Sequence, residues 1–183
     1  MASKLEPTTD RGDASGTGYF STADGTWLPS FAAKAVGHPV ALPRVAGPAE
    51  IVGRTSWGAA LSAGTGDNMG SALGLGLSDD DVLVSIGTSG VAYAVTAKPA
   101  ADPTGLVAGF ADTTGKFLPL VATVNAARVL DVTARLLGVD AAGLSALALA
   151  APPGADGVTL LPYLDGERSP NRPSANGVLR GLT

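Results

Sequence analysis

The chain has 183 residues, of which 45% are hydrophobic and only 15% charged, and its formal net charge is −4. This apolar content is enough for a packed core, and the negative charge argues against a nucleic-acid backbone or an anionic membrane as the partner. With no cysteine and one histidine, the sequence excludes disulfides and thiolate metal sites and has too few histidines for a metal cluster, so we expect no metal-ligating residues.

The first 50 residues contain many turn signals, one of them at 11–13. A short hairpin is expected over 18–27, followed by a helix over 28–36 that ends at Gly37. A proline-rich connector follows over 37–50, and it is either a linker or an ordered crossing within one domain. The side chains expected on the buried side of the helix are Leu28, Phe31 and Ala35.

A helix that starts with an acidic residue is expected over 67–77, after a loop of small residues. Asp67 lies at or next to the N-cap, where a carboxylate meets free backbone N–H groups and the positive end of the helix dipole. An aspartate at this position is usually a cap. The functional alternative is a base that orients a substrate hydroxyl, with Asn68 as its hydrogen-bonding partner. Such a weak base suits phosphoryl transfer, in which the attacking hydroxyl loses its proton late.

Two β-rich runs, 82–86 and 91–95, enclose a glycine-rich turn made of Gly87, Thr88, Ser89 and Gly90. On composition alone this is an ordinary hairpin turn. Its backbone N–H groups and hydroxyls are also the donors that bind an oxyanion such as phosphate. Three carboxylates over 79–81 precede the first run, and they are typical of a solvated turn rather than of a metal site.

The rest of the chain is expected to form two more strands, two helices and a buried strand: 106–110, 117–122, 125–137, 140–152 and 158–161. The side chains at helical spacing in the first of these helices are Val129, Val132, Leu136 and Leu137. Hairpins followed by helices indicate an α/β fold without the steady alternation of a doubly wound parallel sheet. The order is typical of part of a ribonuclease-H-like, actin-type ATPase lobe.

An ordered set of short motifs resembles the FGGY family of carbohydrate kinases. These motifs are Asp13-Ala14-Ser15-Gly16-Thr17, Gly66-Asp67-Asn68, Gly74-Leu75-Gly76, Ser85-Ile86-Gly87-Thr88-Ser89-Gly90, Asn125-Ala126-Ala127-Arg128, Leu161-Pro162-Tyr163-Leu164 and Gly166-Glu167-Arg168-Ser169-Pro170. The resemblance extends from Thr8 to Thr183 and is greatest to bacterial members that phosphorylate D-xylulose.

The resemblance implies transfer of the γ-phosphate of ATP to D-xylulose, giving D-xylulose 5-phosphate, with Mg²⁺ required. It implies that Asp67 takes the proton from the sugar hydroxyl and that Asn68 binds the sugar. It also implies that the turn over 87–90 binds the β- and γ-phosphates. The family has two actin-like lobes, so residues 1–77 are expected to end the first lobe and 78–183 to begin the second. Glu167 and Arg168 either form an ion pair at a domain interface or touch the active site, and the sequence does not choose between these roles.

The chain departs from the family pattern, because it lacks the N-terminal Asp-x-Gly-Thr phosphate loop, the upstream Met-His-Gly segment and the glycine-rich adenine site. We therefore expect a central segment of a longer kinase with no activity of its own. The alternatives are a family member that acts on gluconate, ribulose or glycerol, or an inactive fragment or assembly module. The expected partners are a sugar and ATP, without nucleic acid or membrane, in the cytoplasm; a homodimer is left open.

Overall fold

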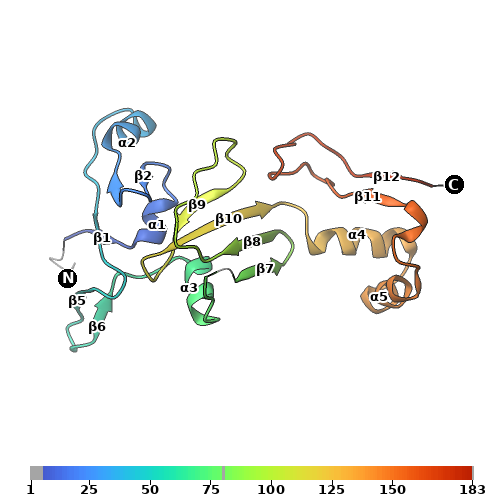
Figure 1. The fold of residues 1–183 in the computed structure, drawn as a ribbon, viewed down its shortest axis with the longest axis horizontal. Helices are drawn as coiled ribbons and strands as arrows, with labels where there is room; N and C mark the ends of the chain where they lie inside the picture. The colour runs from blue at the N-terminus through green and yellow to red at the C-terminus, as the bar shows by residue number, and fades with distance from the viewer. Residues whose placement is uncertain (1–5, 80, 183) are drawn as a thin grey trace. The chain divides into compact units, whose positions relative to one another are not determined.

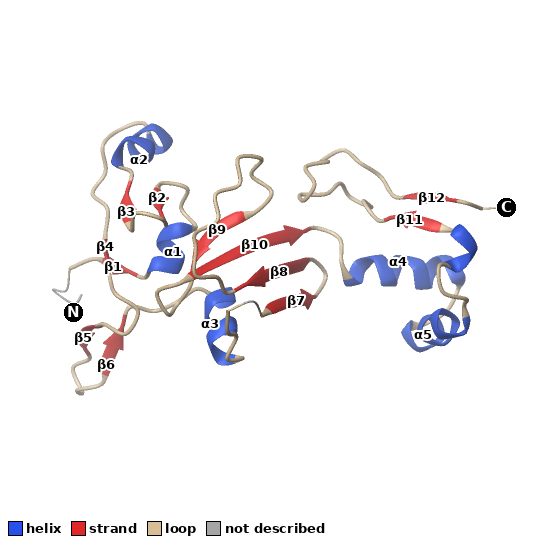
Figure 2. Cartoon of the chain, in the orientation of Figure 1, coloured by secondary structure: helices blue, strands red, loops and turns tan. Residues whose placement is uncertain are grey.

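The computed structural model describes residues 6–79 and 81–182, and Figure 1 shows their helices and strands. The chain forms two compact units. The first extends to Leu83 and includes Tyr93–Leu120, and the second is made of Val84–Ala92 and the chain from Val121 onward. Helices and strands mix in both units (Figure 2), as expected for the α/β class. The lobe boundary between residues 77 and 78 stays a prediction.

The first unit begins with short elements connected by turns. In chain order these are β1 (Thr8–Thr9), α1 (Arg11–Ser15), β2 (Phe20–Ser21), β3 (Thr26–Trp27), α2 (Pro29–Val36), β4 (Arg44–Val45), β5 (Ile51–Arg54), β6 (Ala60–Ser62) and α3 (Asp67–Gly74). The expected hairpin is confirmed as β2 and β3, in which the Phe20 and Trp27 rings meet edge to face at 5.2 Å. The proline-rich connector is an ordered crossing, because β4 pairs in parallel with β1.

Two local expectations in this unit are wrong. The segment at 11–13 lies in helix α1 rather than in a turn, because Asp10 caps it and accepts from two backbone N–H groups. Helix α2 ends at Gly37 in the left-handed conformation, as expected, but Ala32 is its fully buried residue. Phe31, expected on the buried side, is 60% exposed. The apolar spacing of a short helix does not by itself reveal which face is covered.

A four-stranded sheet follows, with the strand order β7-β8-β10-β9. Its strands are β7 (Val82–Ile86), β8 (Gly90–Ala94), β9 (Ala108–Ala111) and β10 (Phe117–Thr123). All four match the expected runs within two residues. β9 and β10 are antiparallel, with Leu118 opposite Phe110, and Leu118 is the largest side chain that is fully buried among the described residues. This part of the sheet supplies the apolar centre of the first unit.

The second unit continues with two helices and a small hairpin. Its elements are α4 (Ala127–Leu137), α5 (Ala141–Ala150), the 3₁₀ turn η1 (Ala155–Gly157), β11 (Thr159–Leu161) and β12 (Val178–Arg180). Gly138 ends α4 in the left-handed conformation and Asp140 caps α5, both as expected. Leu136 and Leu137, two of the side chains at helical spacing, are 74% and 55% exposed. Within the described residues nothing covers this face of α4.

Neither α4 nor α5 alone is long and apolar enough to cross a membrane, and the same holds for each other helix of the described residues. Only when taken together do α4 and α5 have the length and apolar composition of a membrane span, and the two helices are bent by 88° to each other.

Candidate active site

Asp67 is the first residue of α3, directly after the N-cap Gly66, and its side chain is exposed. Its Oδ1 accepts hydrogen bonds from the backbone N–H of Asn68 at 2.7 Å and from the Asn68 side-chain Nδ2 at 3.1 Å. The helix start places positive partial charge beside this carboxylate. The hydrogen bond between Asp67 and Asn68 that was expected from the sequence is confirmed, and the carboxylate is oriented by its neighbour while its side chain stays exposed.

A second carboxylate approaches the start of α3. A Cβ on Gly66 would lie 3.1 Å from Asp13 Oδ1 and 3.1 Å from the sulfur of the buried Met69, so glycine allows this close approach. Partial desolvation raises the pKa of Asp13, and so do the charge of Asp10, a hydrogen bond with it and the charge of Asp67. From the sequence, Asp13 either lines the cleft of the first lobe or caps a turn, and its approach to α3 could not be predicted because it depends on packing between segments far apart in the chain.

The turn over Gly87–Gly90 joins β7 to β8, and its first three residues are exposed. The carbonyl oxygens of Gly87 and Thr88 accept from the backbone N–H groups of Ala127 and Ala126, at 2.9 and 3.3 Å. Within the described residues, the N–H groups and hydroxyls of Thr88 and Ser89 donate to no protein acceptor. The turn therefore keeps its acceptors engaged and presents free donors, which is the arrangement that binds an anion.

The two glycines of this turn differ in their surroundings, and neither has a positive φ. A Cβ on Gly90 would lie 2.9 Å from Thr123 Oγ1 and 3.2 Å from the Ala126 Cβ, so close packing requires glycine there. A Cβ on Gly87 would meet only Ser89 O, at an ordinary 3.5 Å. Neither conformation nor packing within the chain explains Gly87. Gly87 leaves the backbone of the turn open to solvent.

The segment that carries Ala126 and Ala127 is held by Glu167, a residue for which the sequence left an interface ion pair and an active-site contact open. Glu167 is 4% exposed, and its carboxylate accepts from the backbone N–H groups of Val124 and Asn125. Burial alone would raise the pKa of Glu167, yet the hydrogen bonds, that from Val124 first, leave it lowered. Asn125 Oδ1 is the buried side-chain atom without a hydrogen-bond partner in the described residues. Nothing local in the sequence pairs these two residues.

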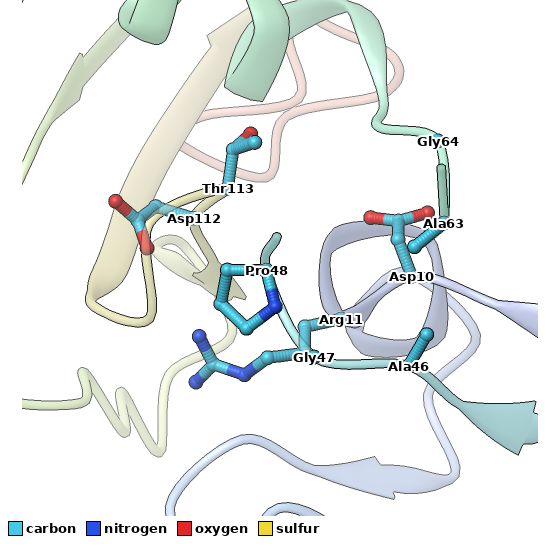
Figure 3. A pocket seen from close by; sticks show the side chains of 9 residues that line it. All are labelled: Asp10, Arg11, Ala46, Gly47, Pro48, Ala63, Gly64, Asp112 and Thr113. Carbon is cyan, nitrogen blue, oxygen red and sulfur yellow. The ribbon is translucent and has the colours of Figure 1, made fainter. Parts of the chain in front are cut away.

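The structure has a small cavity elsewhere in the first unit, shown in Figure 3. Asp10 and Asp112 lie on opposite sides of it, and its volume of about 10 Å³ has room for about one water molecule. Asp112 Oδ1 accepts from N–H groups of its own β9–β10 turn at 2.5 to 3.0 Å. This cavity is too small for a sugar or a nucleotide.

An apolar groove of about 180 Å³ runs beside the 87–90 turn in the second unit. Gly90, Thr123 and Ala126 line it together with side chains of β7 and β8. No group of three His, Asp or Glu side chains that could hold a metal ion occurs in residues 6–79 and 81–182.

Acid is expected to destabilise the chain through Glu167. A carboxyl group whose pKa is lower in the folded state adds stability that is fully present above its ordinary pKa of about 4.3 and is lost as the pH falls. The melting temperature should therefore fall on acidification below about pH 4.3, and it should fall less in Glu167→Gln. Asp102, whose pKa is lowered to about 2, contributes to the fall in both proteins. Melting curves of both proteins from pH 7 to 2.5 test this prediction. An equal fall in melting temperature in the unaltered chain and in Glu167→Gln would contradict it.

No family model matches the sequence. The xylulose kinase of Streptomyces coelicolor, however, is 47% identical over 185 residues that cover 97% of this chain. The chain belongs to the FGGY family of carbohydrate kinases. As an FGGY sequence, it spans 37% of the length of this curated relative.

Solved structures agree with this placement in the FGGY family. The crystal structure of xylulose kinase from Bifidobacterium adolescentis matches 96% of the chain and 39% of its own length, with a TM-score of 0.85 and 42% identity. A gluconate kinase from Lactobacillus acidophilus has the same TM-score over the same shares at 24% identity, which shows the fold alone. These likenesses assign no roles to residues, so Asp67, Asn68 and the 87–90 turn stay predictions as site residues.

Proposed function

We propose that this chain is a segment of an ATP-dependent sugar kinase that phosphorylates D-xylulose to D-xylulose 5-phosphate. The observation that carries the proposal is the 87–90 turn, in which Thr88 and Ser89 offer free donors beside an unobstructed Gly87. The identity to a curated xylulose kinase supports the choice of sugar.

The turn binds the phosphates of ATP. The N–H groups and hydroxyls of Thr88 and Ser89 are exposed and donate to the β- and γ-phosphate oxygens, and Gly87 lets them approach the backbone closely. When bound, Mg²⁺ neutralises charge that develops on the transferring group. The described residues offer no ready-made carboxylate cage, which fits an ion held chiefly by substrate phosphates.

Asp67 acts as the base for the sugar hydroxyl. It is exposed at the start of α3, and Asn68 fixes one of its oxygens while the other stays open to the substrate. Because the proton leaves late in phosphoryl transfer, a weak base in this position is sufficient. Asn68 also binds the sugar, since its amide has hydrogen-bonding capacity beyond the bond to Asp67.

The chain forms part of an actin-type, ribonuclease-H-like architecture, with residues 1–77 from the first lobe and 78–183 from the second. Because the chain spans 37% of its curated relative, we expect it to have no kinase activity alone. A location in the cytoplasm and a homodimer stay predictions.

The second candidate is another FGGY sugar kinase, since a gluconate kinase has the same fold. The same fold serves different sugars, so the substrate has to be measured. We define the hybrid kinase as the S. coelicolor xylulose kinase with its matching stretch replaced by this chain.

ADP release by the hybrid kinase should be measured with Mg-ATP and D-xylulose, D-ribulose, gluconate or glycerol. Xylulose is expected to give the highest kcat/KM, and the unaltered S. coelicolor enzyme is the control. A folded hybrid without activity on xylulose would contradict the proposal, whereas a preference for gluconate would favour the second candidate.

A further inference from the structure

We propose that Glu167 is a positioning residue, which holds the 87–90 turn in its binding conformation through the backbone of residues 124–127 and does not touch the ligand. The inference rests on the proposed phosphate-binding role of the turn. All of its contacts lie within the second unit.

The Glu167 carboxylate is almost wholly engaged by N–H donors. Oε1 accepts from the backbone N–H groups of Val124 at 2.6 Å and Arg168 at 2.7 Å. Oε2 accepts from the Asn125 backbone N–H at 3.3 Å and from its Nδ2 at 3.1 Å. No lysine or arginine of the described chain forms an ion pair with it. A buried carboxylate balanced only by these donors fixes the direction of the backbone that carries them.

Ala126 and Ala127, which follow Asn125, connect this fixed backbone to the turn by hydrogen bonds. The N–H groups of Ala126 and Ala127 donate to the carbonyl oxygens of Thr88 and Gly87. The Thr123 hydroxyl lies 3.4 Å from Gly90 O and 3.1 Å from Asn125 O, so it ties the other end of the turn to the same segment. When the carbonyls of a turn are held, its N–H groups point away from them and toward solvent. The segment therefore sets the direction of the free donors.

Glu167 itself is fixed by its neighbours. Its backbone exchanges two hydrogen bonds of 2.9 Å with Arg172, and Gly166 N–H donates to Ala175 O at 3.0 Å. Gly166 has φ +74°, and a Cβ there would collide with the backbone of Pro173. The Gly166 carbonyl oxygen accepts a hydrogen bond from Asn125 Nδ2 at 2.7 Å. The carboxylate thus lies on a rigid loop, which suits a positioning role.

The test is amide hydrogen exchange and chemical shift by NMR on the 183-residue chain and on its Glu167→Gln variant. Glutamine keeps the size of the side chain but replaces one acceptor by an NH₂ group that faces other donors. Exchange at Ala126 and Ala127 should accelerate by about tenfold or more, and the amide signals of residues 87–90 should shift. Asp140→Ala, which removes the cap of α5 in the same unit, should change α5 instead.

Titration with Mg-ATP then separates this inference from the proposed function. The 87–90 signals of the unaltered chain should respond to Mg-ATP, and those of Glu167→Gln should respond at least about tenfold more weakly. Unchanged protection at Ala126 and Ala127 together with unchanged 87–90 signals would overturn the inference. Lost protection in the variant with no response to Mg-ATP in either chain supports the positioning role and contradicts phosphate binding. If Glu167→Gln does not fold, Glu167→Asp, which keeps the charge but shortens its reach, should show the same local loss.

Discussion

Asp67→Asn is expected to lower the turnover of the hybrid kinase by a factor of about 10²–10⁴ without lowering its stability. Asparagine has the size of aspartate and keeps an oxygen for the N–H of Asn68, so the start of α3 should persist. It cannot accept the proton of the sugar hydroxyl, and it lacks the negative charge that orients that hydroxyl. The loss should therefore appear in kcat, with small changes in the KM for ATP. Steady-state ADP release and melting curves measure both quantities.

Two matched variants control this prediction. Asp24→Asn removes an exposed carboxylate in the β2–β3 turn and should leave turnover unchanged. Asp13→Asn removes the carboxylate that approaches the start of α3. Turnover that survives Asp67→Asn but is abolished by Asp13→Asn would show that the base has been assigned to the wrong residue.

Gly87→Ala and Gly90→Ala each change one end of the same turn, but they should affect different properties. Gly90→Ala should lower stability, and Gly87→Ala should weaken ATP binding. In Gly90→Ala the new Cβ would lie 2.9 Å from Thr123 Oγ1, and the overpacking should cost about 1–3 kcal/mol of the free energy of unfolding. In Gly87→Ala the Cβ meets only an ordinary contact, so stability should change by less than about 0.5 kcal/mol. The KM of the hybrid kinase for ATP should nevertheless rise about tenfold or more, because the methyl group obstructs the approach of the phosphates.

Denaturant unfolding and the KM for ATP distinguish the two effects. Combining Gly90→Ala with Thr123→Ala should recover part of the lost stability, since the shortest contact is removed. If Gly87→Ala leaves the KM for ATP unchanged, the turn does not bind the phosphates closely, and the proposed role is wrong.

Local patterns in the sequence were sufficient to predict much of the fold. The β7–β8 and β9–β10 strands follow from β-rich runs with turn residues between them, and α4 and α5 from a Gly138 stop and an Asp140 cap. Helix α1 was missed because its cap, Asp10, is followed by Arg11-Gly12, which is typical of a turn. Strand β12 was missed because it exists only through pairing with β11, which precedes it by more than a dozen residues.

The candidate site shows the same division between local and distant interactions. The pairing of Asp67 with Asn68 and the presence of a turn at 87–90 follow from neighbouring residues, so both could be predicted from the sequence. Two other contacts join segments that are distant in the chain: Asp13 lies close to Gly66, and the Glu167 carboxylate accepts hydrogen bonds from Asn125. A single sequence carries no signal for such pairs. Burial was misjudged at Phe31, since helical spacing does not reveal which neighbours cover a face.

A crystal structure of the hybrid kinase with Mg²⁺, a non-hydrolysable ATP analogue and D-xylulose would show where the phosphates and the sugar bind. We expect phosphate oxygens about 2.7–3.2 Å from the N–H groups of Thr88 and Ser89. We also expect the O5 hydroxyl of the sugar about 2.6–3.2 Å from the Asp67 carboxylate. Phosphates bound away from the 87–90 turn, or a sugar hydroxyl that meets Asp13 instead of Asp67, would contradict these expectations.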